Sequence, residues 1–422
     1  MKSSEFLRDV ILPMIQKAHD NYLTDSCGSQ WKQQSFTKSG GLQERQSFTK
    51  SGGLQDCPFV GTTIAQHGLF KGHNFDDIPT VYRDKIVAAS RADAIQQKGY
   101  EFRLPDPSHG EGKMRIYRFF VVFPGKKNKS DAFYRDAVYK FFLWISVLMN
   151  FSPEECSREM NVYLYLLPDL KVLPTEKHQA LSQEHVNTAF TRSCSRVSEI
   201  NIFREEEWFK VFIHETFHNN GLDFSLHFNQ YDAAVQNELK RCFPALRSPV
   251  FLYESYCEFW AETLHSLYVA FFLSTRRPRG ATTRKISRHR ESSLWTRAQK
   301  IFKEEHQFSM LQCVKVLDHH GLTFADLVLP PKANAPTYTD INTNSFAYYV
   351  IKCIMFHCNF LDWHLATNGP TLRFSEKNIV GFCHWLHTVR YRMLSSMKRM
   401  EGVYKRVPKS SKMAKTLRMV MN

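Results

Sequence analysis

The stretch VFIHETFHNNGLDF, residues 211–224, contains the pattern H-E-x-x-H, and the interpretation of the chain starts from it. The two histidines are His214 and His218, and Glu215 follows the first of them. Four residues advance an α-helix by about 400°, so the two imidazoles lie on one helix face. Two such imidazoles can bind one zinc ion, and Glu215, on an adjacent face, can reach a zinc-polarised water as a general base.

Strands and helices alternate on the N-terminal side of this pattern. Residues 116–124, 161–168 and 199–204 are rich in β-branched and aromatic residues and predict three strands. Residues 130–151 have helical length after a Ser/Asp start, and residues 186–190 predict a further short strand. The order indicates a fold that contains both α-helices and β-strands.

The motif helix is predicted to begin at about Glu205 and to stop near Gly221. A second helix is predicted over residues 245–273, and it carries three acids one turn apart. They are Glu254, Glu258 and Glu262. Carboxylates among aromatic side chains are costly to bury without a partner, so a metal ion or a histidine N–H is the expected partner.

The pair of helices resembles the zincin metallopeptidases, and within them the gluzincin branch. That resemblance implies an α+β fold whose zincin-like domain has a small mixed sheet, the H-E-x-x-H helix and the glutamate helix; a mostly helical C-terminal region is predicted to follow it. The resemblance further implies a zinc cofactor and a peptide or protein substrate. It also implies His214, His218 and Glu254 as zinc ligands, with Glu258 supporting a ligand histidine. The stretch 199–225 also resembles uncharacterised zincin-like proteins of large DNA viruses.

Two alternatives to this ligand set remain open. The residue before Glu254 is Tyr253, where gluzincins usually have Asn, so Glu258 is an alternative ligand with Glu262 behind it. The metzincin pattern is the second alternative, but its third ligand position is occupied by Phe224. The nearby residues Asp223 and His227 are one and three positions away from it.

The resemblance also suggests residues that contact the substrate. Gluzincins hold the substrate backbone against a sheet edge, which points to Asn187 and Ala189 in the segment VNTAF. An oxyanion donor is expected farther along the chain, and Tyr348 and Tyr349 are the candidates.

The basic residues are concentrated in two segments. The formal net charge is +15, and most of it lies in residues 276–290 and in the C-terminal tail from residue 391. Such segments are candidates for binding nucleic acid or another polyanion. The longest apolar run, residues 141–151, is too short for a membrane span.

Ten cysteines without regular spacing predict reduced thiols rather than a disulfide framework. The N-terminus is too charged for a signal peptide. We therefore expect a cytoplasmic protein that is not secreted, with a nuclear or virion location as the alternative.

The predicted organisation has six segments. They are an N-terminal helix (1–30), a flexible linker with the duplicated QSFTKSGGLQ (31–57), the zincin-like catalytic domain (58–273), a basic loop (274–293), a helical region (294–400) and a loose basic tail (401–422). The predicted function is zinc-dependent peptide hydrolysis. The alternative is a nucleic-acid-associated structural or virion-type protein with an inactive zincin fold.

Overall fold

The structure is a computed structural model. It describes residues 2–24, 54–55, 75–92, 95–107, 113–124, 129–275, 288–331, 333–341 and 343–421. Residues 276–287 of the predicted basic loop 274–293 lie outside these residues, and from Arg288 onward the chain is helical rather than a loop. Most of the duplicated linker also lies outside them. The last two residues of the second repeat are described, and they form the short strand β1 (Leu54–Gln55).

The chain forms two compact units, which we name by their content. The sheet unit comprises Asp9–Leu170 and Thr188–Leu222, and the helical unit comprises Met1–Arg8, Lys171–Asn187 and Asp223–Asn422. The predicted α+β class is confirmed, since the protein combines helices with one mixed sheet.

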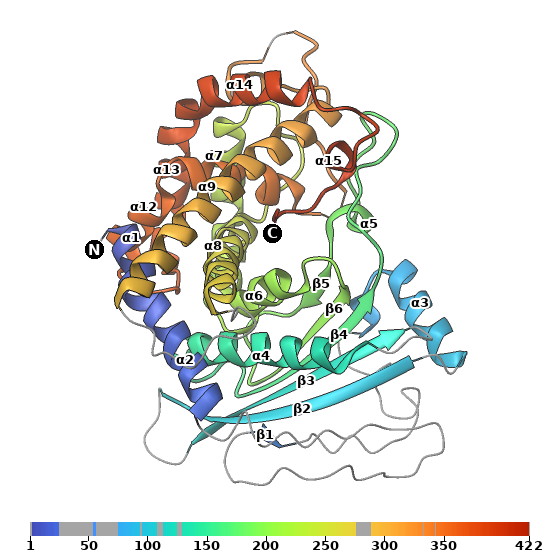
Figure 1. Cartoon of the computed structure of the whole chain (residues 1–422). Helices are drawn as coiled ribbons and strands as arrows, with labels where there is room; N and C mark the ends of the chain where they lie inside the picture. The colour runs from blue at the N-terminus through green and yellow to red at the C-terminus, as the bar shows by residue number, and fades with distance from the viewer. Residues whose placement is uncertain are drawn as a thin grey trace. The chain divides into compact units, whose positions relative to one another are not determined.

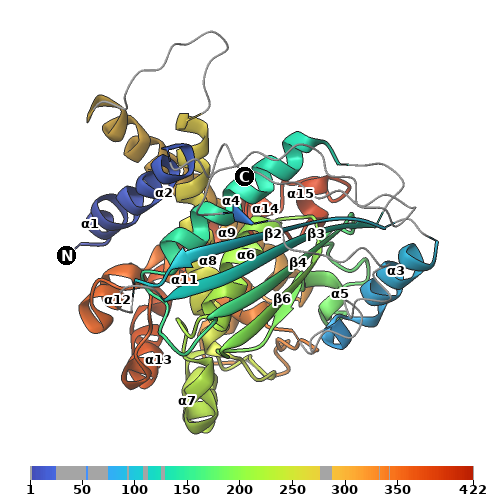
Figure 2. The same cartoon turned by 90° about the horizontal axis from the view of Figure 1, so that it is seen from below.

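The sheet unit is built on six strands in the order β1-β2-β3-β4-β6-β5 (Figures 1 and 2). Besides β1, the strands are β2 (Ile95–Pro105), β3 (Met114–Pro124), β4 (Glu159–Leu167), β5 (Ala189–Thr191) and β6 (Val197–Arg204). β3, β4 and β6 run parallel, whereas β1, β2 and β5 pair antiparallel with their neighbours. The three strands predicted from composition are thus confirmed as the centre of the sheet.

Helices pack on both faces of this sheet because alternate residues of β3 point to opposite sides. Phe119 stacks on Phe141 of α4 (Asp131–Leu148), with 4.4 Å between ring centroids. Phe120 and Val122 instead join the apolar cluster beneath α3 (Thr80–Arg91). The remaining helices of the unit are η4 (Phe75–Asp77), α2 (Leu12–Thr24), which packs on α4, and the motif helix α6 (Trp208–Asn219).

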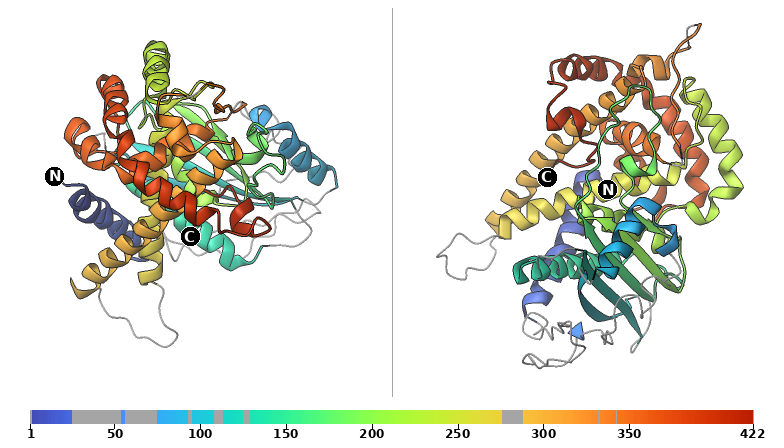
Figure 3. Two further views of the ribbon diagram at one scale, coloured as in Figure 1. Left: turned by 90° about the horizontal axis from the view of Figure 1, so that it is seen from above. Right: turned by 90° about the vertical axis from the view of Figure 1, so that its right-hand side faces the viewer.

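The helical unit begins with α1 (Ser3–Glu5), which leads into the π-helical segment η1 (Phe6–Ile11). The helices of its middle part are α5 (Gln183–Val186), η5 (Ser225–His227), α7 (Phe228–Cys242), α8 (Leu252–Thr275), α9 (Arg288–His319) and α10 (Phe324–Val328). Those that follow are η6 (Phe346–Ile351), α11 (Lys352–His357), α12 (Phe360–Asn368), η7 (Glu376–Asn378), α13 (Ile379–Val389), η8 (Arg390–Met393), α14 (Leu394–Tyr404) and α15 (Lys412–Lys415). α8 and α14 both pack on α9, and α7 packs on α13 (Figure 3).

Two predictions for the helical unit need correction. The helix predicted over 245–273 begins only at Leu252, because Leu246 pairs with Tyr338 in an isolated β-bridge. The basic tail is not loose, since Leu417 and Val420 are fully buried and main-chain groups of residues 416–421 bind to other parts of the unit. No helix in the described part of the chain is both long and apolar enough to cross a bilayer.

Candidate metal centre

The motif helix α6 is buried along its whole length, including both histidines and the glutamate between them. Its C-terminal end is closed by Gly221, which adopts a positive φ of 58°. The N–H of Gly221 donates to the carbonyl of His218, and the N–H of Leu222 donates to that of Phe217. These two bonds form a Schellman motif, so the predicted stop at Gly221 is confirmed.

The two histidines of the motif are brought together as the helical spacing requires. The Nε2 atoms of His214 and His218 lie 3.2 Å apart, and the ring planes are inclined by 68°. Two nitrogens bound to one tetrahedral zinc ion, with Zn–N bonds near 2.05 Å, lie about 3.3 Å apart. The pair therefore fits two ligand positions of a zinc ion. The same separation also suits a hydrogen bond between the two rings.

Polar side chains beside the histidines hold α6 in place within the sheet unit. Trp144 of α4 donates its indole N–H to the hydroxyl of Thr216, over 2.8 Å. The amide of Asn219 donates to the hydroxyl of Thr191 in β5 and accepts a bond from Ser157. The last turn of the motif helix is thus attached to an adjacent helix, to the edge strand and to the loop that precedes β4.

The three acids of α8 have different surroundings in the helical unit. Glu254 is partly exposed, and its carboxylate accepts a hydrogen bond of 2.9 Å from the hydroxyl of Tyr348. Glu258 is buried. Glu262 is also buried and forms an ion pair with Lys352. Glu262 therefore has a charged partner of the kind that its burial requires, the ammonium group of Lys352.

The other predicted site residues fall into two groups. The hydroxyl of Tyr349 is buried and donates to the carbonyl of Leu417, whereas Tyr348 points to Glu254 from the same π-helical segment, η6. Asn187 ends the short helix α5 in the helical unit. Ala189 lies in the edge strand β5, where it pairs with Ile202 of β6.

The residues of the metzincin alternative are engaged within the helical unit. Phe224 packs against Phe374, with 4.5 Å between the ring centroids. Asp223 accepts hydrogen bonds from Ser225, and exposed His227 pairs with Glu376.

Side chains of His, Cys, Asp and Glu form groups that could hold a metal ion among the residues that the structure describes. His218 belongs to each of these groups. The imidazole and carboxylate donors are of the types that zinc takes in catalytic sites.

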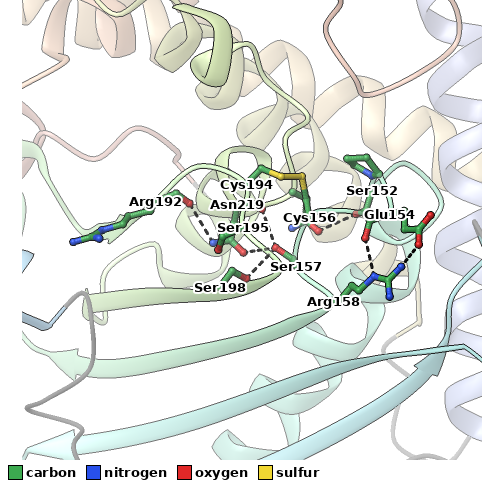
Figure 4. The surroundings of a disulfide bond; sticks show 12 residues. Ser152, Glu154, Cys156, Ser157, Arg158, Arg192, Cys194, Ser195, Ser198 and Asn219 are labelled. Carbon is green, nitrogen blue, oxygen red and sulfur yellow. Dashed lines mark hydrogen bonds and ion pairs between the residues drawn. A yellow bond between two sulfur atoms is a disulfide. The ribbon is translucent and has the colours of Figure 1, made fainter.

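A feature next to α6 was not predicted from the sequence. Cys156 and Cys194 form a disulfide, with 4.9 Å between their Cα atoms, so the prediction of reduced thiols is wrong for this pair (Figure 4). Each cysteine lies three residues before its strand, and the strand residues Glu159 and Val197 pair with each other in the sheet. Parallel neighbouring strands therefore bring the two cysteines together. The six other cysteines identified as free are buried.

Comparisons with protein-family models, with curated proteins and with solved structures find no match to this chain.

Proposed function

We propose that the protein is a zinc-dependent peptide hydrolase. The observation that carries the proposal is the pair of Nε2 atoms, 3.2 Å apart, on a buried helix that also carries Glu215. Buried imidazoles with this separation suit two of the three protein ligands of a catalytic zinc. The position of Glu215, directly after the first histidine, is typical of the general base in the H-E-x-x-H pattern.

We assign the third ligand to α8, as the gluzincin resemblance implies. Glu254 is the first choice because it is partly exposed and therefore accessible to an ion, and Glu258 is the alternative. The hydroxyl of Tyr348 fixes one carboxylate oxygen of Glu254. Such a hydrogen bond orients a ligand carboxylate, and it also keeps a phenol near the reacting atoms.

The chemistry divides between the ion and the residues of the chain. A bound zinc ion would act as a Lewis acid and would lower the pKa of an attacking water. Glu215 accepts a proton from that water and delivers it to the leaving amine, which is the task of a general base that becomes a general acid. Once its hydroxyl turns away from Glu254, Tyr348 is the proposed donor to the carbonyl oxygen as negative charge develops on it.

The proposed substrate is an extended peptide. β5 is the edge strand of the sheet and it runs antiparallel to β6, whose last residue, Arg204, lies four residues before α6. A peptide that adds to this edge would gain main-chain hydrogen bonds, as in other cases of strand addition. Ala189 lies in this edge strand and Asn187 two residues before it, so both are proposed to contact the substrate.

Metal content and peptide cleavage test the proposal together. The purified chain should contain about one zinc ion per molecule, and His214→Ala should abolish this binding. Cleavage of a library of internally quenched peptides should be lost in Glu215→Gln but retained in the control Glu155→Gln, which changes an exposed glutamate. A zinc-free wild-type preparation from zinc-replete medium contradicts the proposal.

The C-terminal region favours a second candidate, the binding of a polyanion such as nucleic acid. Basic side chains of α14, α15 and the residues around them are exposed to solvent. They are Arg392, Lys398, Arg399, Lys405, Arg406, Lys409, Lys412 and Lys415. Exposed basic groups of this density bind phosphates in a salt-dependent manner. The predicted basic loop 276–290 lies almost entirely outside the described residues.

Charge substitutions test this candidate better than deletion, because deletion would remove the buried residues Leu417 and Val420. Lys405→Gln combined with Arg406→Gln should weaken binding to a DNA duplex at low salt. Each lost phosphate contact should also reduce the slope of log K against log salt by about one. Equal binding and an equal slope in wild type and variant contradict it. Peptide cleavage should not change.

A further inference from the structure

The disulfide Cys156–Cys194 links two loops at the C-terminal end of the motif helix α6 (Figure 4). Cys156 belongs to the loop before β4, and Cys194 belongs to the loop before β6. A main-chain hydrogen bond of 2.7 Å from Ser157 to Ser195 also joins the two loops. All these residues lie within the sheet unit.

The loop of Cys156 is held firmly by Arg115 of β3. The guanidinium group is completely buried and pairs with Asp106 over 2.9 Å. It also donates to the carbonyls of Cys156 and Pro153, over 2.7 and 2.8 Å. This side of the disulfide is therefore fixed to the core of the sheet.

The loop of Cys194 is mostly exposed, and it contacts the motif helix directly. Arg192, Ser195 and Arg196 are exposed, and Cys194 itself is half-buried. The main-chain N–H of Cys194 donates to the carbonyl of His218 over 3.1 Å. Next to it, the amide of Asn219 donates to the carbonyl of Arg192. The loop that the disulfide restrains is thus bonded to a proposed zinc ligand and to the residue after it.

We infer that the Cys156–Cys194 disulfide is a positioning element of the histidine site, and that its redox state sets the affinity of His214 and His218 for zinc. The disulfide transfers the rigidity of the loop held by Arg115 to the exposed loop that holds the carbonyl of His218. Reduction removes this restraint, and the last turn of α6 then orients His218 less strictly. The inference rests on the proposed function and assigns a form of regulation to the same site.

A phosphine reduces this bond in a two-electron reaction. The S–S bond breaks, and two electrons from phosphorus and two protons convert the sulfur atoms to the thiols of Cys156 and Cys194. The phosphine becomes its oxide, with an oxygen atom from water. A phosphine is the suitable reductant for the test because a dithiol would itself bind zinc.

The experiment compares zinc affinity and amide hydrogen exchange in the oxidised and phosphine-reduced full-length chain. Reduction should weaken zinc binding about ten-fold, the size of effect seen when an outer-shell contact of a ligand is lost. In zinc-free protein it should also accelerate exchange at the N–H groups of Asn220, Gly221 and Leu222, which close the end of α6.

Variants distinguish the effect of losing the disulfide from the effect of the two thiols that its reduction creates. Cys156→Ser combined with Cys194→Ser should bind zinc weakly under both conditions. Ser195→Ala, which removes a hydroxyl that donates to the carbonyl of Val197 at the start of β6, should respond to reduction as the wild type does. Unchanged exchange at the end of α6, or unchanged zinc affinity, overturns the inference. If the oxidised chain binds no zinc, the proposed function fails, and the exchange experiment still decides whether the disulfide restrains the helix.

Discussion

Lys352 and Glu262 form an ion pair in the core of the helical unit, and neither side chain has appreciable contact with solvent. Their positions, 90 residues apart, lie on α11 and α8. The pair gives one of the three acids of α8 a charged partner inside the core. Among these acids, Glu254 and Glu258 remain as candidates for the third zinc ligand.

The ion pair leads to a prediction about stability. Lys352→Met leaves the carboxylate of Glu262 buried without its cation, so the free energy of unfolding should fall by about 3–5 kcal/mol. The double variant Lys352→Met, Glu262→Leu should be more stable than either single variant, because no charge remains buried. Urea unfolding of the four proteins gives the coupling energy. Additive effects of the two substitutions contradict the assignment of the pair.

A second prediction distinguishes the general base from the ligands. Glu215→Gln should retain zinc and fold but lose turnover on a cleavable peptide by several orders of magnitude. Glu254→Gln should lose zinc affinity as well. Metal analysis and peptide cleavage on the same preparations separate these outcomes. If Glu258→Gln loses zinc while Glu254→Gln retains it, the third ligand lies one turn farther along α8.

Much of the sheet unit follows from local sequence patterns. The apolar residues of 116–124, 161–168 and 199–204 alternate or run together as strands do. Each segment lies within an observed strand, except that β4 ends one residue before Pro168. Gly221 ends the motif helix because its positive φ suits a residue without a side chain. These features depend on a few neighbouring residues, and they can therefore be predicted from one sequence.

The parts that could not be predicted depend on contacts between distant residues. Nothing near Glu262 indicates that Lys352 is its partner. The disulfide requires knowledge that β4 and β6 are neighbours. The charge of the C-terminal residues predicts a loose tail, but Leu417 and Val420 are apolar and are fully buried. In each case, the tertiary fold decides which side chains meet.

Loss of the disulfide should also lower the stability of the sheet unit. The two cysteines are 38 residues apart, and closing a loop of this length reduces the entropy of the unfolded chain. That effect corresponds to about 4 kcal/mol in the free energy of unfolding at 25 °C. Cys156→Ser combined with Cys194→Ser should therefore unfold at lower urea concentration than the oxidised wild type. Reduced wild type should resemble the variant, and an equal midpoint for all three contradicts the prediction.

Lys315 provides a further observation about the C-terminal residues. Its ammonium group is buried, and it donates to the carbonyl of Thr416 and to the side chain of Gln312, both over 2.6 Å. The amide of Gln312 in turn donates to the carbonyl of Arg418. Two side chains of α9 thus bind the main chain of the last residues, and burial lowers the pKa of Lys315 to about 7.

The lowered pKa of Lys315 predicts how stability depends on pH. Between about pH 7 and pH 10.5 the unfolded chain keeps a proton that the folded protein has released, so raising the pH favours the folded state. The unfavourable contribution of Lys315 is complete below about pH 7, and it disappears as the pH approaches the unfolded value. Lys315→Met removes the titrating group. The stability of wild type relative to this variant should therefore rise by up to about 1.4 kcal/mol per pH unit over that range.

Urea unfolding near pH 7 and near pH 9.5 measures the change, and Lys412→Met, on the exposed surface of α15, is the control that should show none. A difference between wild type and Lys315→Met that does not vary with pH would mean that Lys315 keeps its proton in the folded protein.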